Sequence, residues 1–194
     1  MIKLKYGNTN TFYINGLLID TDYIGTINNF YKCIKSNNIN INDIKYVIAT
    51  HYHPDHIGLI PNLMKLGIKL IIVDIQKDYI HFSDNIFKKE NYDYYINEED
   101  ALILDINNSR EFLKSLNIDG CIIHTPSHSN DSISIILDNG SIIVGDLEPL
   151  SYIDIYKDNI KLKNDWDNIL KHNIKCVYFA HHGEEEIKPT NLLK

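Results

Sequence analysis

Short apolar and polar blocks alternate along this chain, and their spacing predicts a protein of strands and helices. Residues 11–14 and 17–20 have the pattern of two strands joined by Asn15-Gly16, a pair that favours a two-residue hairpin turn. Apolar residues then recur at helical spacing from position 24 to position 34. A compact apolar run at residues 46–50 predicts the next strand, so the fold opens with a hairpin, a helix and a strand.

The rest of the chain continues with the same kinds of element. The pattern predicts, in order, a helix at 57–66, a strand at 70–73, a hairpin of strands 132–137 and 142–144, a helix at 164–172 and a strand at 176–180. Residues 76–125 are less regular, with a helix expected at 109–116 that Ser109 would cap. Because no linker or low-complexity stretch interrupts these elements, we expect one domain over residues 1–194.

Four of the apolar runs end in side chains that bind metals. The run His51-Tyr52-His53-Pro54-Asp55-His56 follows residues 46–50, His128 follows 121–123, Asp146 closes 141–146, and His181-His182 follow 176–180. Neutral imidazole and carboxylate are good ligands for zinc and its first-row neighbours. His51 and His53 are two residues apart on a strand tip and therefore project to the same side. Four such strand ends in one small chain predict a metal site.

These motifs, in this order, resemble those of the metallo-β-lactamase fold hydrolases. The resemblance rests on residues 51–56, Thr125-Pro126-Ser127-His128-Ser129, Gly145-Asp146 and His182-Gly183. It implies an α/β fold of the four-layer αβ/βα sandwich type, in which two mixed sheets are flanked by helices and a two-metal site lies along one edge. It also implies a ligand set, with His51, His53 and His128 on the first metal, Asp55, His56 and His182 on the second, and Asp146 bridging both.

Two features of the sequence bear on that ligand set. Ser127 stands where the family most often has Gly, and Asn130-Asp131 stand where a Pro-Gly pair is common. The second feature is the pair His181-His182. Neighbours on a strand point to opposite faces, so only one of the two should reach the metal. Gly183 follows His182, as a Gly usually follows the ligand in the family, and the prediction is therefore His182.

The ligand set predicts metal-dependent hydrolysis. Two cations about 3.5–4 Å apart can share a hydroxide, lower its pKa and hold it against an electrophilic centre. Asp55 could also orient the nucleophile or take up its proton, so it is both a candidate ligand and a candidate general base. Zinc is the expected ion, with iron or manganese as alternatives for ligands of this kind. Tyr52, Glu148 and Tyr152 are the candidates for contact with substrate.

The resemblance narrows the substrate by elimination. True metallo-β-lactamases generally lack the bridging aspartate, so Asp146 argues against antibiotic hydrolysis. Glyoxalase II relatives have a further C-terminal region, whereas this chain stops twelve residues after His182, and RNase Z-like nucleases have basic elements that the sequence lacks. Flavodiiron oxidoreductases carry a carboxylate in place of one histidine and usually add a flavodoxin domain, whereas position 53 is His. We therefore expect a small ester, thioester or lactone as substrate; a phosphodiesterase and a non-hydrolytic metal-binding or redox protein are the alternatives.

Composition and charge fit this interpretation. The formal net charge of −7 and the lack of a basic cluster argue against a nucleic-acid partner. The N-terminus lacks the apolar core of a signal peptide, and no run approaches the length of a membrane span. Three cysteines far apart, Cys33, Cys121 and Cys176, form no disulfide framework. We expect a cytoplasmic protein with a small-molecule substrate and no membrane partner, and leave open a homodimer, which many relatives form.

Overall fold

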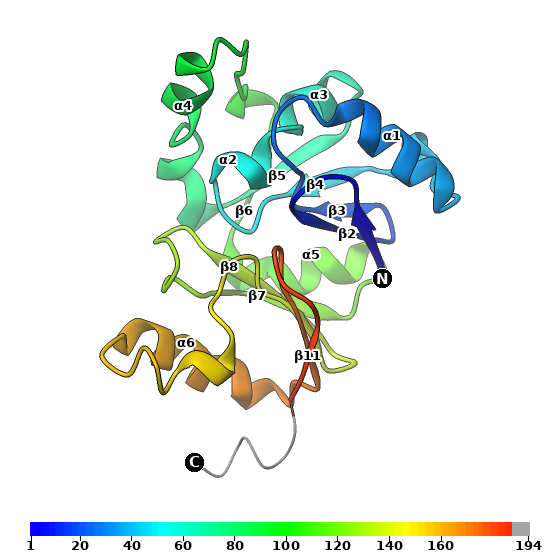
Figure 1. Cartoon of the computed structure of the whole chain (residues 1–194). Coiled ribbons are helices and arrows are strands. Elements are labelled where there is room, and N and C mark those ends of the chain that lie inside the picture. The colour runs from blue at the N-terminus through cyan, green and yellow to red at the C-terminus, as the bar shows by residue number, and fades with distance from the viewer. Residues whose placement is uncertain (188–194) are drawn as a thin grey trace.

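The computed structural model describes residues 1–187, and in it the chain forms two mixed β-sheets packed face to face (Figure 1). The first sheet has the order β1-β2-β3-β4-β5-β6. Its strands are β1 (Ile2–Lys5), β2 (Asn10–Ile14), β3 (Leu17–Ile19), β4 (Tyr46–Ile48), β5 (Lys69–Val73) and β6 (Leu102–Leu104). β1 to β3 are antiparallel neighbours, whereas β3 to β6 run parallel. The hairpin of β2 and β3 turns at Asn15-Gly16, which both have positive φ, as the sequence predicts.

The second sheet has the order β11-β10-β9-β8-β7. Its strands are β7 (Gly120–His124), β8 (Ile133–Leu137), β9 (Ser141–Ile143), β10 (Cys176–Tyr178) and β11 (Glu185–Glu186). β8 is antiparallel to both β7 and β9, and β9 is parallel to β10. Consequently β7, β9 and β10 all run in one direction and end at the same edge of the sheet.

Helices flank the two sheets. They are α1 (Ile27–Ser36), α2 (Pro54–Ile57), α3 (Ile60–Lys65), α4 (Asp84–Lys89), α5 (Ser109–Ser115) and α6 (Ile160–Ile169). In Figure 1 the first sheet lies below α1 and α3, and the second sheet lies above α6. Phe30 of α1 and Leu63 of α3 pack on the outer face of the first sheet, and Trp166 of α6 packs on that of the second. These layers confirm the predicted arrangement of two mixed sheets flanked by helices.

A third group of buried side chains joins the two sheets. Phe12 and Ile48 of the first sheet meet Ile135 and Ile143 of the second in one cluster, all of them fully buried. Leu113 of α5 closes this cluster at the side. Burial on both faces explains why β5 is apolar from Leu70 to Val73 and why β8 is buried at every position, Ser134 included.

Several predicted boundaries differ from those of the structure. The helix expected at 57–66 is two short helices, α2 and α3, and the one expected at 164–172 begins earlier, at Ile160. The predicted cap at Ser109 is wrong, because Asn108 is the N-cap and the Ser109 hydroxyl instead accepts the N–H of Ile122 at 3.1 Å. A partner on β7, far along the chain, therefore decided the role of this serine.

None of the helices in residues 1–187 combines the length and the apolar character that a membrane span requires. Residues 188–194 lie outside the described part of the chain, so a single domain over residues 1–194 stays a prediction.

Candidate metal centre

Loops at the ends of four strands bring the candidate ligands together. His128, Asp146 and His181 follow β7, β9 and β10, the three strands of the second sheet that end at one edge. Residues 51–56 follow β4 of the first sheet. Because the two sheets pack face to face, their loops meet at this edge, and the site depends on both halves of the fold.

The local sequence shapes the histidine loop. His53 has φ −76° and ψ 153°, the extended conformation that a residue before proline prefers. Pro54 begins α2, a position where its missing N–H removes no helical hydrogen bond. This turn leaves His53 half-buried at the mouth of the site while His56, on α2, is fully buried.

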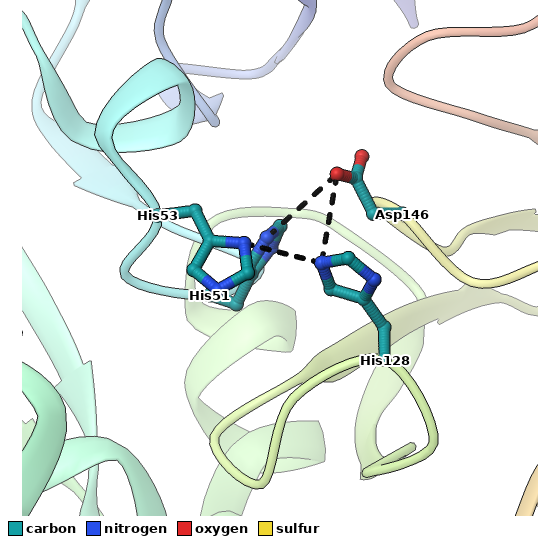
Figure 2. A group of neighbouring side chains, drawn as sticks. All are labelled: His51, His53, His128 and Asp146. Atoms are coloured by element: carbon teal, nitrogen blue, oxygen red, sulfur yellow. Dashed lines mark hydrogen bonds and ion pairs between the residues drawn. The ribbon is translucent and has the colours of Figure 1, made fainter.

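A first group of ligand atoms comes from His51, His53, His128 and Asp146, all within 4.8 Å of one another. Figure 2 shows the three rings and the carboxylate converging on one point from separate segments of the chain. His128 Nε2 is 3.1 Å from His53 Nδ1, and it is 3.7 Å from Asp146 Oδ2. His51 Nε2 lies 3.9 Å from the same oxygen.

A second group comes from Asp55, His56 and His181, again within 4.8 Å of one another. His181 Nε2 is 3.0 Å from Asp55 Oδ2 and 3.3 Å from Asp146 Oδ1. His56 Nε2 is 3.3 Å from the same Asp146 oxygen. Asp146 therefore lies between the groups, with Oδ2 toward the first and Oδ1 toward the second.

The structure corrects the choice between the two adjacent histidines. His181 belongs to the second group, whereas His182 belongs to neither, and the His182 ring packs edge-on to Phe179 with centroids 5.9 Å apart. The alternation argument fails because β10 ends at Tyr178 and the chain bends at residues 180–182. Asn10 N–H donates to the carbonyl of Ala180 at 2.7 Å and fixes that bend.

Gly145 places Asp146 through its backbone and its small size. It has φ +59°, which favours glycine, and a Cβ built there would lie 2.4 Å from Thr50 Oγ1. A larger residue would push the loop after β9 away from Thr50 and displace the Asp146 carboxylate.

Asp20 is a residue of the site that sequence reasoning missed. Its carboxylate is fully buried behind His56, with Oδ2 at 3.1 Å from His56 Nδ1. It also accepts hydrogen bonds from the N–H and the hydroxyl of Thr50, at 2.6 and 2.9 Å. A carboxylate on the far ring nitrogen fixes the orientation of a ligand histidine. The available signal was an apolar run that ends on Asp, as the run before Asp146 does.

The site electrostatics favour neutral imidazole in the first group. Burial, together with the neighbouring His56 and His53 rings, lowers the pKa of His51 well below its usual value. Burial and His128 likewise lower the pKa of His53. These two rings are therefore unprotonated near neutral pH, which is the form that binds a metal.

In the second group, neighbouring charges outweigh the effect of burial on the pKa values. Burial alone would lower the pKa of His56, but the carboxylates of Asp20 and Asp146 outweigh it and raise that pKa to about 10. Burial would raise the pKa of Asp55, yet its hydrogen bond to His181 and the charge of His56 bring it down to about 2. Both carboxylates that face the site are therefore ionised near neutral pH, since the pKa of Asp146 is also lowered, by His56 against the effect of burial.

The donor atoms fit a pair of divalent cations. Within residues 1–187, the buried side-chain atoms without a hydrogen-bond partner include His51 Nε2, His56 Nε2 and Asp146 Oδ1, and all three face the site. Such atoms are rare in folded proteins unless a water, ligand or ion pairs with them. Imidazole nitrogens and carboxylate oxygens suit zinc, iron and manganese alike.

Comparison with known proteins decides the family. The model of the family described as the metallo-beta-lactamase superfamily matches residues 6–181. The chain belongs to the metallo-beta-lactamase superfamily. The matched region contains residues 51–56, 125–129 and 145–146 but not His182-Gly183, and it confirms the predicted family.

Relatives in the superfamily differ in activity. A probable metallo-hydrolase of Methanocaldococcus jannaschii is 32% identical over 154 residues, which are 75% of this chain and 71% of that protein. An atrochrysone carboxyl ACP thioesterase of Claviceps purpurea is 26% identical over 70% of this chain and 38% of its own length. A putative diflavin flavoprotein of Nostoc is 30% identical over 59% of this chain. The match spans only 20% of that flavoprotein's length.

Solved structures of superfamily members share the fold. A superfamily protein from Sulfolobus tokodaii superimposes with a TM-score of 0.66 at 16% identity, over 95% of this chain and 80% of that one. A flavo di-iron protein of Thermotoga maritima gives a TM-score of 0.64 at 18% identity, over 95% of this chain and 50% of that one. At these identities the likeness shows a shared fold.

The three predicted substrate contacts have different outcomes. Tyr52 is fully buried in the first sheet's outer cluster, so its side chain lines no open pocket and that prediction is corrected. Glu148 is half-buried and Tyr152 is exposed; neither belongs to a ligand group, and their contact with substrate stays a prediction.

Proposed function

We propose that this protein is a binuclear metal-dependent hydrolase of small esters, thioesters or lactones. The observation that carries the proposal is the position of Asp146, whose two oxygens face two separate groups of ligand atoms. A carboxylate so placed would hold two cations side by side, with His51, His53 and His128 on one and Asp55, His56 and His181 on the other. Zinc is the proposed ion, and iron or manganese would suit the same donors.

Two bound cations would activate a water nucleophile and polarise the oxygen of the scissile bond. The side chains supply the remaining tasks. Asp55, 35% exposed at its side chain and ionised at neutral pH, is placed to orient the water nucleophile through its carboxylate. His51 and His56 are buried, so their rings close the inner side of the site to water. Asp20 holds His56 in one orientation through its Nδ1.

A hollow beside the first group offers a place for the acyl part of a substrate. It has a volume of about 280 Å³ and borders His53 and His128. Phe82 and Tyr79 form an apolar side, and Lys161 lies on the rim. Phe82 is 57% exposed, with its ring 5.5 Å from that of His53, so an apolar chain could cover it next to the metals. The metallo-hydrolase relative supports hydrolysis, and the thioesterase relative supports an acyl substrate.

The test is a substrate panel on zinc-loaded protein. We expect turnover of 4-nitrophenyl acetate, an acyl thioester or a γ-lactone, and little of bis(4-nitrophenyl) phosphate. Asp146→Ala should abolish turnover, whereas Lys163→Gln, on the solvent face of α6, serves as the matched control. Efficient cleavage of the phosphate diester with no acyl turnover would replace this proposal with a phosphodiesterase.

A redox protein is the second candidate, favoured by the flavoprotein relatives and the di-iron neighbour. In that case iron-loaded protein would consume oxygen when given a chemical reductant, and zinc-loaded protein would hydrolyse nothing. The identity of residue 53 weighs against a redox protein. The family resemblance implies that flavodiiron oxidoreductases carry a carboxylate in place of one histidine, whereas residue 53 is His.

A further inference from the structure

We propose that Asp131 is a positioning residue that ties the loop of His51 and His53 to the loop of His128. Its side chain reaches both loops. Asp131 Oδ2 accepts the backbone N–H of Tyr52 at 2.7 Å, and Oδ1 accepts the hydroxyl of Ser129 at 2.5 Å. Asp131 belongs to neither group of ligand atoms, so it would act through its neighbours. This inference rests on the proposed metal site.

The two loops need such a link because they come from different sheets. His51 and His53 follow β4 of the first sheet, while His128 follows β7 of the second. The first group of ligands can converge only if these loops keep a fixed separation. Ligand atoms must be held within a few tenths of an ångström for productive geometry. A rigid contact across the join between the sheets meets that need.

The hydrogen bond to Tyr52 acts at a sensitive point. The Tyr52 N–H lies in the backbone between His51 and His53, and Tyr52 is fully buried. A buried N–H that loses its acceptor is costly, so the loop would turn to find another. Because the two histidines flank this amide directly, such a turn would move both rings.

The surroundings make Asp131 a rigid anchor. Its exposed fraction is only 3%, and Gln76 donates from its side-chain amide to the Asp131 carbonyl at 3.1 Å. The same Gln76 amide donates to the Ala49 carbonyl at 3.1 Å, and Ile133 N–H donates to the Thr50 carbonyl at 2.8 Å. Hydrogen bonds to backbone carbonyls thus fix the main chain at Asp131, and the carboxylate then joins the two loops.

The sequence supplies this link at residue 131. Asp131 stands where the family resemblance implies that a Gly is common. Glycine has no side chain and could supply neither hydrogen bond. The Asn130-Asp131 departure therefore replaces a small turn residue with a carboxylate that joins two ligand loops.

The test measures metal binding to each ligand group separately, in variants that each lack one ligand of the other group. In a His181→Ala background only the first group is complete, and in a His128→Ala background only the second. Co²⁺ affinity is measured in each by competition with a chromophoric chelator. We expect Asp131→Ala to weaken Co²⁺ binding by about 10–100-fold in the first background, the usual effect of removing a residue that orients a ligand. In the second background the expected weakening is smaller, because Asp131 contacts no side chain of that group and Asp20 holds His56 at 3.1 Å.

Two further variants distinguish loss of the Asp131 hydrogen bonds from a general loss of stability. Asp131→Asn keeps the shape and can still bond both loops, so it should restore much of the affinity. Leu113→Ala removes a buried side chain of α5 that belongs to neither ligand group, and it should lower stability without changing Co²⁺ affinity. Equal weakening in both backgrounds, or an Asp131→Ala affinity like that of the unmodified background, would overturn the inference.

Amide hydrogen exchange at Tyr52 provides a readout that needs no metal. We expect Asp131→Ala to speed exchange at this amide in metal-free protein, and Asp131→Asn to do so much less. Slow exchange in Asp131→Ala would overturn the link. A protein that bound no Co²⁺ in any form would refute the proposed function, while the exchange result would still decide whether Asp131 holds the histidine loop.

Discussion

Asp20→Asn tests the role of the buried carboxylate behind His56. Asp20 is fully buried and accepts three contacts, from Thr50 N–H, the Thr50 hydroxyl and His56 Nδ1. Removing one partner of a buried charge pair typically costs about 3–5 kcal/mol. We expect a loss of that order in the free energy of unfolding of metal-free protein at pH 6, measured by urea denaturation with the fluorescence of the single tryptophan, Trp166.

The pH dependence of this loss has a definite sign. The pKa of His56 is raised from 6.5 to about 10, so its stabilisation is fully present below 6.5 and is lost as the pH rises through about 10. The cost of Asp20→Asn should therefore shrink between pH 6 and pH 10. Some cost should persist, because the hydrogen bonds to Thr50 do not depend on His56, and because Asp146 shares in raising the His56 pKa.

Asp22→Asn is the matched control. Asp22 is also buried and accepts backbone N–H groups, those of Thr9 and Tyr23, but it pairs with no imidazole. The loss in the free energy of unfolding that Asp22→Asn causes should therefore be the same at pH 6 and pH 10. A loss of unfolding free energy below about 1 kcal/mol for Asp20→Asn at pH 6 would refute the pairing of Asp20 with His56. An equal loss at pH 6 and pH 10 would refute it too.

Other predictions concern metal content and packing. His181→Ala should lower zinc content from about two ions per chain to about one, while His182→Ala keeps about two, as measured by elemental mass spectrometry; the reverse result would restore the sequence-based choice. Chelation should lower the melting temperature of zinc-loaded protein, and added zinc should restore it, because the ions bind only the folded chain. Trp166→Ala should cost about 3–5 kcal/mol by circular dichroism in urea, since the ring is fully buried against the second sheet. Arg110→Ala should cost less than about 1 kcal/mol by calorimetry, because its pair with Asp138 is exposed.

The sequence by itself determined most of the elements and which side chains are candidate ligands. Apolar periodicity marked the strands, and strands that run in one direction end at one edge, so polar residues after them had to gather there. His51, His53, Asp55, His56 and His128 follow from this rule, and so does Asp146. Their grouping is local enough to be read from spacing, because each stands within a few residues of a strand end.

Only the tertiary structure decided the side chains whose direction depends on a distant segment. His181 rather than His182 faces the site because Asn10, from β2, fixes the bend after β10. Asp20 meets His56 only when β3 lies beside β4, and Asp131 meets Tyr52 only when the two sheets pack together. Beyond the end of a strand the two-residue alternation no longer applies, and hydrogen bonds between residues far apart in the chain set which way a side chain points.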